Sequence, residues 1–241
     1  LTLDGDGNAT IVEQGGVSTP ANWNLLSILR RTITAYDSFG RKTRDDVVNI
    51  GTGASDAVTQ YSYDAAGRLE CTAGRMNPAV YGPSLPGACT QYTPGTYGPD
   101  RIVRTTYTAN GDVSVVQSGY STALQRNERT FTYLAPGQVE TIKDALNNLT
   151  TYEYEGFNRL SKTRYPLTTA GANASSTTDF EQLTYDAASN IVTERRRDGL
   201  TITNTWDNLN RLRLINRPGA ELDVTNSYDN HNRMVSATQT G

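Results

Sequence analysis

The stretch Tyr63-Asp64-Ala65-Ala66-Gly67-Arg68 decides the fold of this chain, because it recurs along nearly the whole sequence. Tyr36-Asp37-Ser38-Phe39-Gly40-Arg41 repeats it closely, and more divergent copies begin at Leu3, Tyr107, Tyr133, Tyr154, Tyr185, Trp206 and Tyr228. An aromatic residue opens most copies, Asp usually follows it, and Gly or Asn usually stands four positions after the aromatic. About nine copies in one register predict a repeat protein.

The repeat has the chemistry of a β-hairpin turn, which we call a corner. Alternating residues such as Thr150-Thr151-Tyr152-Glu153-Tyr154 predict a strand that ends at the aromatic position. Asp at the first position of a type I turn can accept a backbone N–H two residues on. Gly or Asn then tolerates the positive φ that closes such a hairpin with a bulge. We therefore interpret the acidic residues as turn residues and not as catalytic carboxylates.

The residues that carry this structural repeat are the corner aromatics, the acids beside them and the Gly or Asn that follows. They are Tyr36, Asp37, Gly40, Tyr63, Asp64, Gly67, Tyr107, Gly111, Tyr133, Gly137, Tyr154, Asn158, Tyr185, Asp186, Trp206, Asp207, Asn210, Tyr228, Asp229 and Asn232.

The spacing of the corners predicts an all-β, antiparallel meander of hairpins. A unit of about 21 residues holds two strands and two turns. Asp198-Gly199, which favours a two-residue hairpin loop, and Pro218-Gly219 predict return turns at the opposite edge. We treat residues 1–241 as one repeat region in a single continuous sheet, with loop insertions near 15–28, 44–58, 74–100 and 168–180.

Composition excludes several other classes. The chain of 241 residues has a net charge of −3, 36% hydrophobic residues and 14 Tyr. The weak acidity gives no basic face for nucleic acid, and no apolar run reaches the length of a membrane span. A signal peptide is not evident, and the first residue is Leu, so we expect the chain to be part of a longer polypeptide.

At Tyr63-Asp64-x-x-Gly67-Arg68-Leu69, repeated in register, the chain resembles the RHS/YD-repeat family. That family includes bacterial RHS polymorphic toxins, the C component of insecticidal toxin complexes and the YD shell of teneurins. The resemblance implies a curved, spiralling β-sheet strip that forms part of a hollow shell, and in toxin members an enclosed effector domain. Self-cleaving members carry an Asp-Pro segment after the repeats. No Asp-Pro occurs here, so no protease residues are carried over.

A size estimate indicates a partial shell. About 18 strands at about 4.8 Å spacing form a ribbon about 86 Å wide. A wall around a cargo of about 130 residues needs a circumference of about 140 Å. The remainder of a longer RHS polypeptide, or other copies of the chain, would have to complete it.

Cys71 and Cys89 flank a Pro- and Gly-rich insertion. A disulfide closing this loop suits an exported protein and would contribute about 3 kcal/mol. Two unrelated free thiols are the alternative. Zinc needs four ligands, which two Cys and one His do not supply, and we expect no metal or cofactor.

The remaining polar motifs favour structural interpretations. His231 stands between two Asn in a corner, where a solvated turn residue is expected. Arg195-Arg196-Arg197 could contact an acidic cargo, but Glu194 and Asp198 balance it. The Asp4 to Asn8 stretch suggests calcium, yet it lacks the later ligands of such a loop and falls in the corner register.

Two functions follow as hypotheses, and no nucleophile–base pair supports a third, enzymatic one. The first is a shell segment of a bacterial secreted or cell-surface protein, enclosing an effector and without catalysis. The second is an extracellular glycan-binding or adhesion module, because exposed Tyr and Trp rings stack on sugars. Its unprotected sheet edges would allow such a module to assemble into fibres. Ring-on-ring stacking between successive hairpins is the competing use for the same aromatics.

Overall fold

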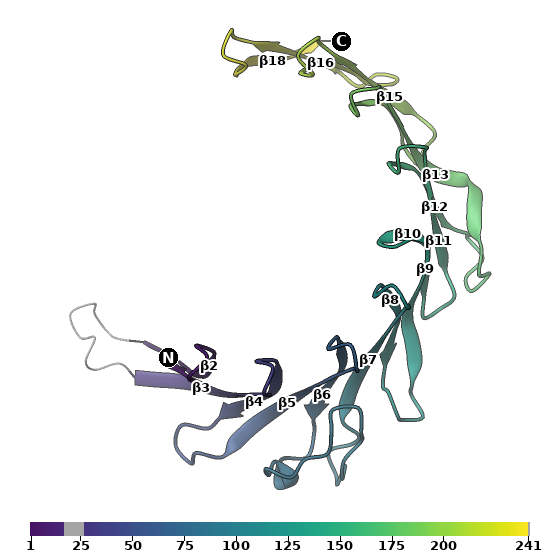
Figure 1. The fold of residues 1–241 in the computed structure, drawn as a ribbon. Helices are drawn as coiled ribbons and strands as arrows, with labels where there is room; N and C mark the ends of the chain where they lie inside the picture. Colours follow the sequence, from purple (N-terminus) through teal and green to yellow (C-terminus); the bar gives the residue numbers. More distant parts are fainter. Residues whose placement is uncertain (17–26, 241) are drawn as a thin grey trace. The chain divides into compact units, whose positions relative to one another are not determined.

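The structure is a computed structural model, and it describes residues 1–16 and 27–240. It is all-β apart from one short 3-10 helix, η2 (Pro78–Val80). Contacts divide the chain into two compact units, Leu1–Arg129 and Thr130–Gly241. Each unit is a single-layer sheet, drawn edge-on in Figure 1.

The first unit is a meander in which each strand pairs antiparallel with the next. Its strands are β1 (Thr2–Leu3), β2 (Ala9–Gly16), β3 (Ser27–Tyr36), β4 (Lys42–Val48), β5 (Ser55–Tyr63), β6 (Leu69–Arg75), β7 (Arg101–Tyr107) and β8 (Val113–Ser118). β9 (Arg126–Ala135) contains the boundary between the units.

The second unit repeats this arrangement, again pairing successive strands antiparallel. Its strands are β10 (Gln138–Asp144), β11 (Leu149–Tyr154), β12 (Leu160–Pro166), β13 (Ser175–Tyr185), β14 (Ile191–Arg195), β15 (Thr201–Trp206), β16 (Leu212–Asn216), β17 (Asp223–Tyr228) and β18 (Met234–Thr240). The predicted antiparallel hairpin meander is therefore confirmed.

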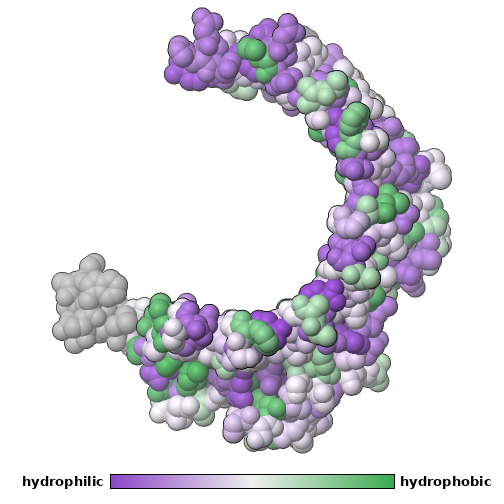
Figure 2. All heavy atoms as spheres, viewed as in Figure 1, coloured by the Kyte–Doolittle hydropathy of each residue, from purple (hydrophilic) through white to green (hydrophobic). Residues whose placement is uncertain are grey.

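Hydrophobic burial is concentrated in the first unit. Among the described residues the buried hydrophobic side chains are those of Val48, Val58, Cys71, Ala73, Ala88 and Ile102. Figure 2 shows hydrophobic residues as small patches separated by hydrophilic ones on the face in view. A single layer has no second layer to bury its faces against, so polar links between strands must contribute much of the stability.

The predicted loops differ from the structure in extent. β4 and β5 occupy most of the predicted 44–58 insertion, and residues 49–54 alone connect them. This polar stretch forms strand because its charged side chains find partners on the sheet: Arg44 pairs with Asp46, and Thr34 donates a hydrogen bond to Asp45 at 2.7 Å. β13 likewise begins at Ser175, inside the predicted 168–180 loop, and most of the predicted loop at 15–28 lies outside the described residues.

Two further connections depart from the sequence analysis. The long loop expected at 74–100 runs between β6 and β7. Residues 119–125, between β8 and β9, form a further loop that was not among the predicted insertions. The turn at Asp198-Gly199 spans residues 196–200, where the Arg196 N–H donates to the Leu200 carbonyl at 2.8 Å. It is a corner-type turn and not a two-residue loop, because the positive φ of 89° falls on Gly199 alone of the two.

Candidate functional site: linked corners and a braced loop

Most corners are closed by an acidic residue, as the turn at Asp64 illustrates. The Gly67 N–H donates to the Asp64 carbonyl and the Asp64 N–H to the Arg68 carbonyl, both at 2.9 Å. The Asp64 carboxylate accepts the N–H groups of Ala66 and Arg68 through one oxygen and the Arg68 guanidinium through the other. One side chain thus satisfies the backbone of the turn and fixes the direction of the arginine.

The residue four positions after the acid lowers the acid's pKa. At Asp64, Asp207 and Glu155 the largest cause is the hydrogen bond from the arginine side chain, and the pKa of Glu155 falls from 4.5 to about 2. At Asp186 the side chain of Asn190 has the same effect on the pKa. These carboxylates are acceptors held ionised in the turns.

Each corner has a residue with positive φ four positions after its first residue, and in most corners this residue is the predicted Gly or Asn. The residues with positive φ at the corners are Gly7, Gly40, Gly67, Gly111, Gly137, Asn158, Ser189, Asn210 and Asn232. Ser189, at φ 70°, shows that the turn imposes this backbone even on a residue that disfavours it.

The corner aromatics link each hairpin to the preceding one. Tyr63 donates its O–H to the Lys42 carbonyl at 2.8 Å, Tyr185 to Leu160 at 2.7 Å, and Trp206 its ring N–H to Ile191 at 3.0 Å. Tyr36, Tyr107, Tyr154 and Tyr228 donate in the same way to Ala9, Leu69, Val139 and Leu212. In each case the acceptor lies at the start of the second strand of the preceding hairpin.

At four corners an arginine links its hairpin to the following one. The guanidinium of Arg41 lies 4.4 Å from the Tyr63 ring centroid, and that of Arg68 lies 4.4 Å from Tyr107. In the second unit Arg159 covers Tyr185 at 4.5 Å and Arg211 covers Tyr228 at 4.7 Å. At these four corners a guanidinium lies between a hairpin and the ring of the next one. We call this arrangement, together with the hydrogen bonds of the corner rings, the corner ladder.

The corner ladder corrects the expectation that the rings stack on one another. Successive corners are separated by two strands, and at four of them an arginine side chain reaches the ring of the next corner. Glu155 and Thr108 also cap their turns, although they were not among the predicted repeat residues. Both stand in register directly after a corner tyrosine. The corner at Tyr133 has no such acid, and β9 continues to Ala135, leaving a two-residue turn at Pro136 and Gly137.

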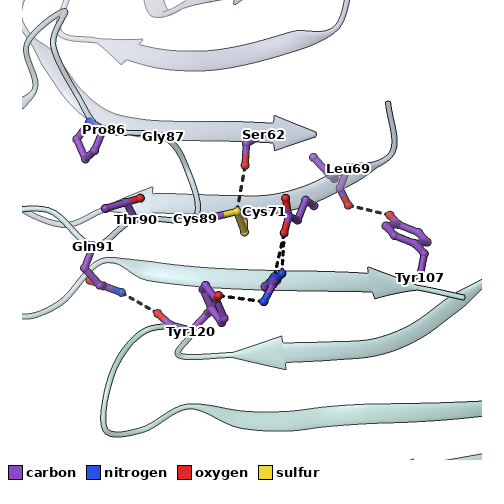
Figure 3. The surroundings of a disulfide bond; sticks show 12 residues. Ser62, Leu69, Cys71, Pro86, Gly87, Cys89, Thr90, Gln91, Tyr107 and Tyr120 are labelled. Atoms are coloured by element: carbon purple, nitrogen blue, oxygen red, sulfur yellow. Dashed lines mark hydrogen bonds and ion pairs between the residues drawn. A yellow bond between two sulfur atoms is a disulfide. The ribbon is translucent and has the colours of Figure 1, made fainter. Parts of the chain in front are cut away.

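A second feature is the loop 76–100, which covers one face of β5 to β7. The structure joins Cys71 on β6 to Cys89 in the loop by a disulfide, and the Ser62 hydroxyl lies 3.3 Å from the Cys89 sulfur (Figure 3). Cys71, Ala73, Ala88 and Ile102 form a small hydrophobic core beneath the loop.

A buried ion pair holds the base of this loop. Arg75 and Asp100 meet at 2.6 Å, with side chains 1% and 4% exposed. Arg75 also donates to the carbonyls of Pro86, Gly87 and Thr90, so one guanidinium gathers three loop carbonyls and one carboxylate. Beside the disulfide, Gln91 donates to the Tyr120 carbonyl (Figure 3). We call residues 71–100 with this pair and the disulfide the braced loop.

The braced loop borders a groove of about 470 Å³, with Tyr97, Ile102 and Leu124 among its mostly apolar lining. Tyr97 is 54% exposed and Leu124 79% exposed. The titratable residues in its lining are Tyr97, Asp100 and Arg101, and the carboxylate of Asp100 is already bonded to Arg75. Its chemistry suits a contact surface better than a reaction.

The other predicted sites are turn and sheet residues. His231 donates its backbone N–H to Asp229 and is exposed. Arg195 lies over the Phe180 ring at 3.8 Å, while Arg196 pairs with Glu221 and Arg197 with Asp179. Within residues 1–16 and 27–240 no group of three His, Cys, Asp or Glu could hold a metal ion, and no helix could cross a membrane.

Comparison with known proteins gives a likeness of fold. No family model matches the chain, and no curated protein matches its sequence. A TcdB2-TccC3 crystal structure matches with a TM-score of 0.57 and 17% identity over 96% of this chain. The same complex without its hypervariable C-terminal region matches with a TM-score of 0.47 and 18% identity over 88%, and a Photorhabdus luminescens Tc holotoxin pore with 0.46 and 14% over 95%.

The chain spans a small part of these structures, covering 13%, 12% and 14% of the matched chains. At such low identities the likeness shows the fold alone. It rests on the TcdB2-TccC3 crystal structure that matches with a TM-score of 0.57. Together with the repeated corners and the single-layer antiparallel sheets, it shows that this chain has the fold of a partial β-shell of the RHS type.

Proposed function

We propose that the chain is a wall segment of an RHS-type shell, in a bacterial secreted or cell-surface protein whose shell encloses an effector domain. The corner ladder carries the proposal. It ties successive hairpins within each unit to one another through side chains of the turns, which lets a sheet extend without a thick core. The role is structural, with no catalysis by this segment.

The mechanism we propose is confinement by a wall of hydrogen-bonded strands. Pairing every strand to its neighbours removes the open edges that invite aggregation. The exposed polar and charged side chains of the sheet suit contact with water or with a polar cargo surface. Support for the wall comes from the fold likeness to the TcdB2-TccC3 structure, while the cargo and the exported location are inferences from the RHS/YD resemblance.

The test is electron microscopy of the full-length polypeptide that carries this segment, combined with limited proteolysis. We expect a closed hollow particle with density inside, and sequences outside the repeats that resist protease while the wall is intact. Filaments, open sheets, or cargo sequences digested as fast as exposed loops would contradict the proposal.

The glycan-binding alternative is best supported at the groove beside the braced loop. The corner rings are engaged, since Tyr63 donates its O–H to Lys42 and has Arg41 over its ring. Tyr97 beside the 470 Å³ groove is the exposed aromatic next to a cavity. Glycan-array binding that is lost in Tyr97→Ala, but kept in Trp206→Ala, would favour adhesion over the wall.

A further inference from the structure

We propose that a groove beside Tyr154 binds a guanidinium group, carried by an arginine side chain of a partner polypeptide. The groove has a volume of about 330 Å³, and its lining includes Pro136, Gln138, Tyr154 and Asn158. These residues all belong to the second unit. The inference goes beyond the wall function and does not depend on it, because it concerns the chemistry of this groove alone.

The first observation is that Gln138 occupies a position that arginine holds elsewhere in the corner ladder. Each of the four ladder arginines stands directly before the residue whose carbonyl accepts the O–H of the next corner tyrosine. Tyr154 donates its O–H to the Val139 carbonyl at 2.8 Å, and the residue before Val139 is Gln138. Gln138 therefore stands in the register from which an arginine would cover the Tyr154 ring.

The second observation is the open face of the Tyr154 ring. Four corner rings have an arginine guanidinium at 4.4 to 4.7 Å from their centroids. In the part of the chain that the structure describes, the arginine and lysine side chains that lie over aromatic rings all lie over rings other than that of Tyr154. The Tyr154 ring instead lines the groove together with Gln138. The groove thus lies between the arginine position and the ring that an arginine would cover.

The third observation is a hydrogen-bond acceptor in the lining of the groove. In the ladder, Arg159 donates through Nη1 to the Ser189 hydroxyl at 2.9 Å. Arg211 likewise donates through Nη1 to the Asn232 side-chain oxygen at 3.0 Å. Both acceptors belong to the positive-φ residue of the following corner. Asn158, with φ 60°, holds that position in the corner that borders the groove, so its side-chain oxygen is the equivalent acceptor for a bound guanidinium.

A guanidinium suits this site better than an ammonium or a neutral amide. It is planar, so it lies flat on a ring while the N–H groups at its edge donate to an acceptor such as Asn158. An ammonium lacks the planar face, and a neutral amide lacks the charge. Leu134 stands where most corners carry Asp or Glu, so this corner supplies no carboxylate to the guest. We therefore expect weak binding, with a Kd of about 1 mM.

The experiment titrates the chain with a capped Gly-Arg-Gly peptide and follows the ring signals of Tyr154 by NMR. A matched peptide carries citrulline, in which a neutral urea group of the same shape replaces the guanidinium. We expect saturable shifts with the arginine peptide and binding about threefold weaker with the citrulline peptide, because the charge is lost. Equal binding of the two peptides would overturn the inference. Methylguanidinium that binds more tightly than the arginine peptide would overturn the assignment to a polypeptide.

Substitutions of Gln138 locate the binding. Gln138→Arg supplies the arginine from the same chain, so it should weaken peptide binding about tenfold by occupying the site, while the Tyr154 O–H keeps its acceptor. Thr177→Arg, at an exposed residue near the start of β13 and away from the corners, adds the same charge and should leave the binding unchanged.

A second substitution at the same position should have the opposite effect. Gln138→Glu keeps the size of the side chain and adds the carboxylate that this corner lacks, so it should tighten binding of the arginine peptide about threefold. Unchanged binding in both Gln138 variants, or equal weakening in Gln138→Arg and Thr177→Arg, would overturn the inference. Electron microscopy of the parent polypeptide tests the wall function separately, and its outcome does not alter these binding results.

Discussion

At the scale of single residues, the corner divides its tasks among distinct side chains. The acid closes the turn, the Gly or Asn supplies positive φ, the aromatic reaches back and the arginine reaches forward. Each task has its own physical reason, so substitutions at neighbouring positions of one corner should have different effects.

The two glycines of the first corner should respond differently to alanine. Gly7 has φ 85° and Gly5 does not have positive φ, and a Cβ at either would meet nothing within 4 Å. Gly7→Ala should therefore destabilise the turn by about 1–2 kcal/mol through backbone strain alone. Gly5→Ala, the matched control, should be neutral or slightly stabilising. Amide exchange of the Asp4 and Gly7 N–H groups measures both, and equal effects would contradict the assignment.

Removing the hydroxyl of Tyr185 tests the hydrogen bond between a corner ring and the preceding hairpin. Tyr185→Phe keeps the ring under Arg159 but loses the donor to the Leu160 carbonyl, so it should lower the free energy of unfolding by about 0.5–1.5 kcal/mol. Urea unfolding measures this. Tyr97→Phe, at an exposed tyrosine, should change little. A loss in the control as large as that in Tyr185→Phe would show that the link to Leu160 is not the cause.

At the scale of elements, the braced loop is the one described place where the sheet acquires a local core. Its disulfide closes a separation of 18 residues, and its buried guanidinium binds carbonyls from both sides of Cys89. The loop is thus held both by the disulfide and by the buried Arg75–Asp100 ion pair. Leaving either of these buried charges unpaired would lower the free energy of unfolding.

Breaking the buried pair should cost far more than breaking an exposed one. Arg75→Met leaves Asp100 buried without its guanidinium and should destabilise the first unit by about 3–5 kcal/mol. The control, Arg104→Met, removes the half-exposed pair with Glu70 and should cost at most about 1 kcal/mol. Thermal unfolding with proteolysis of the loop 76–100 measures the difference, and equal costs would argue against a bracing role for Arg75.

Reduction of the disulfide gives a second prediction for this element. Cys71→Ser combined with Cys89→Ser should lower the free energy of unfolding by about 3 kcal/mol, because the open loop regains chain entropy in the unfolded state. Urea unfolding of the native protein with and without a thiol reductant should reproduce the loss. The double variant should not respond to the reductant.

At the scale of the whole molecule, the two units share the corner ladder but differ in burial. The first unit adds the braced loop and the described buried hydrophobic side chains, while the buried residues described in the second unit are the polar Ser176 and Asn226. The second unit should therefore depend more strongly on its polar links, and on the ionisation of the carboxylates in them.

Acid should destabilise the protein through its corners. The lowered pKa of Glu155, about 2 against an ordinary 4.5, and the lowered values at Asp64, Asp186 and Asp207 mean that folding favours the ionised forms. This stability is complete above the unfolded pKa values and is lost as pH falls from about 4 toward 2. Urea midpoints should be steady from pH 7 to 5 and fall below 4. Glu155→Gln should reduce the slope, and a constant midpoint down to pH 2 would contradict the assignment.

The sequence by itself determined the hairpins. Tyr, Asp and Gly at fixed spacing encode a turn through local backbone preferences, which act within a few residues, so the corners and the strands between them could be predicted. The local pattern made the predicted loop at 44–58 too long. The polar Asp45 and Asp46 look unlike strand residues until their partners on the neighbouring strands, Thr34 and Ser55, are known.

Only the tertiary structure decided what the side chains contact. Arg41 and Tyr63 lie in different hairpins, and no local preference says that a guanidinium will lie between successive rings. Arg75 and Asp100 are likewise brought together by the path of a 25-residue loop. Local conformational preferences depend on residues that are neighbours in the sequence. Contacts between hairpins depend instead on the spacing of paired strands, which exists only once the sheet has formed.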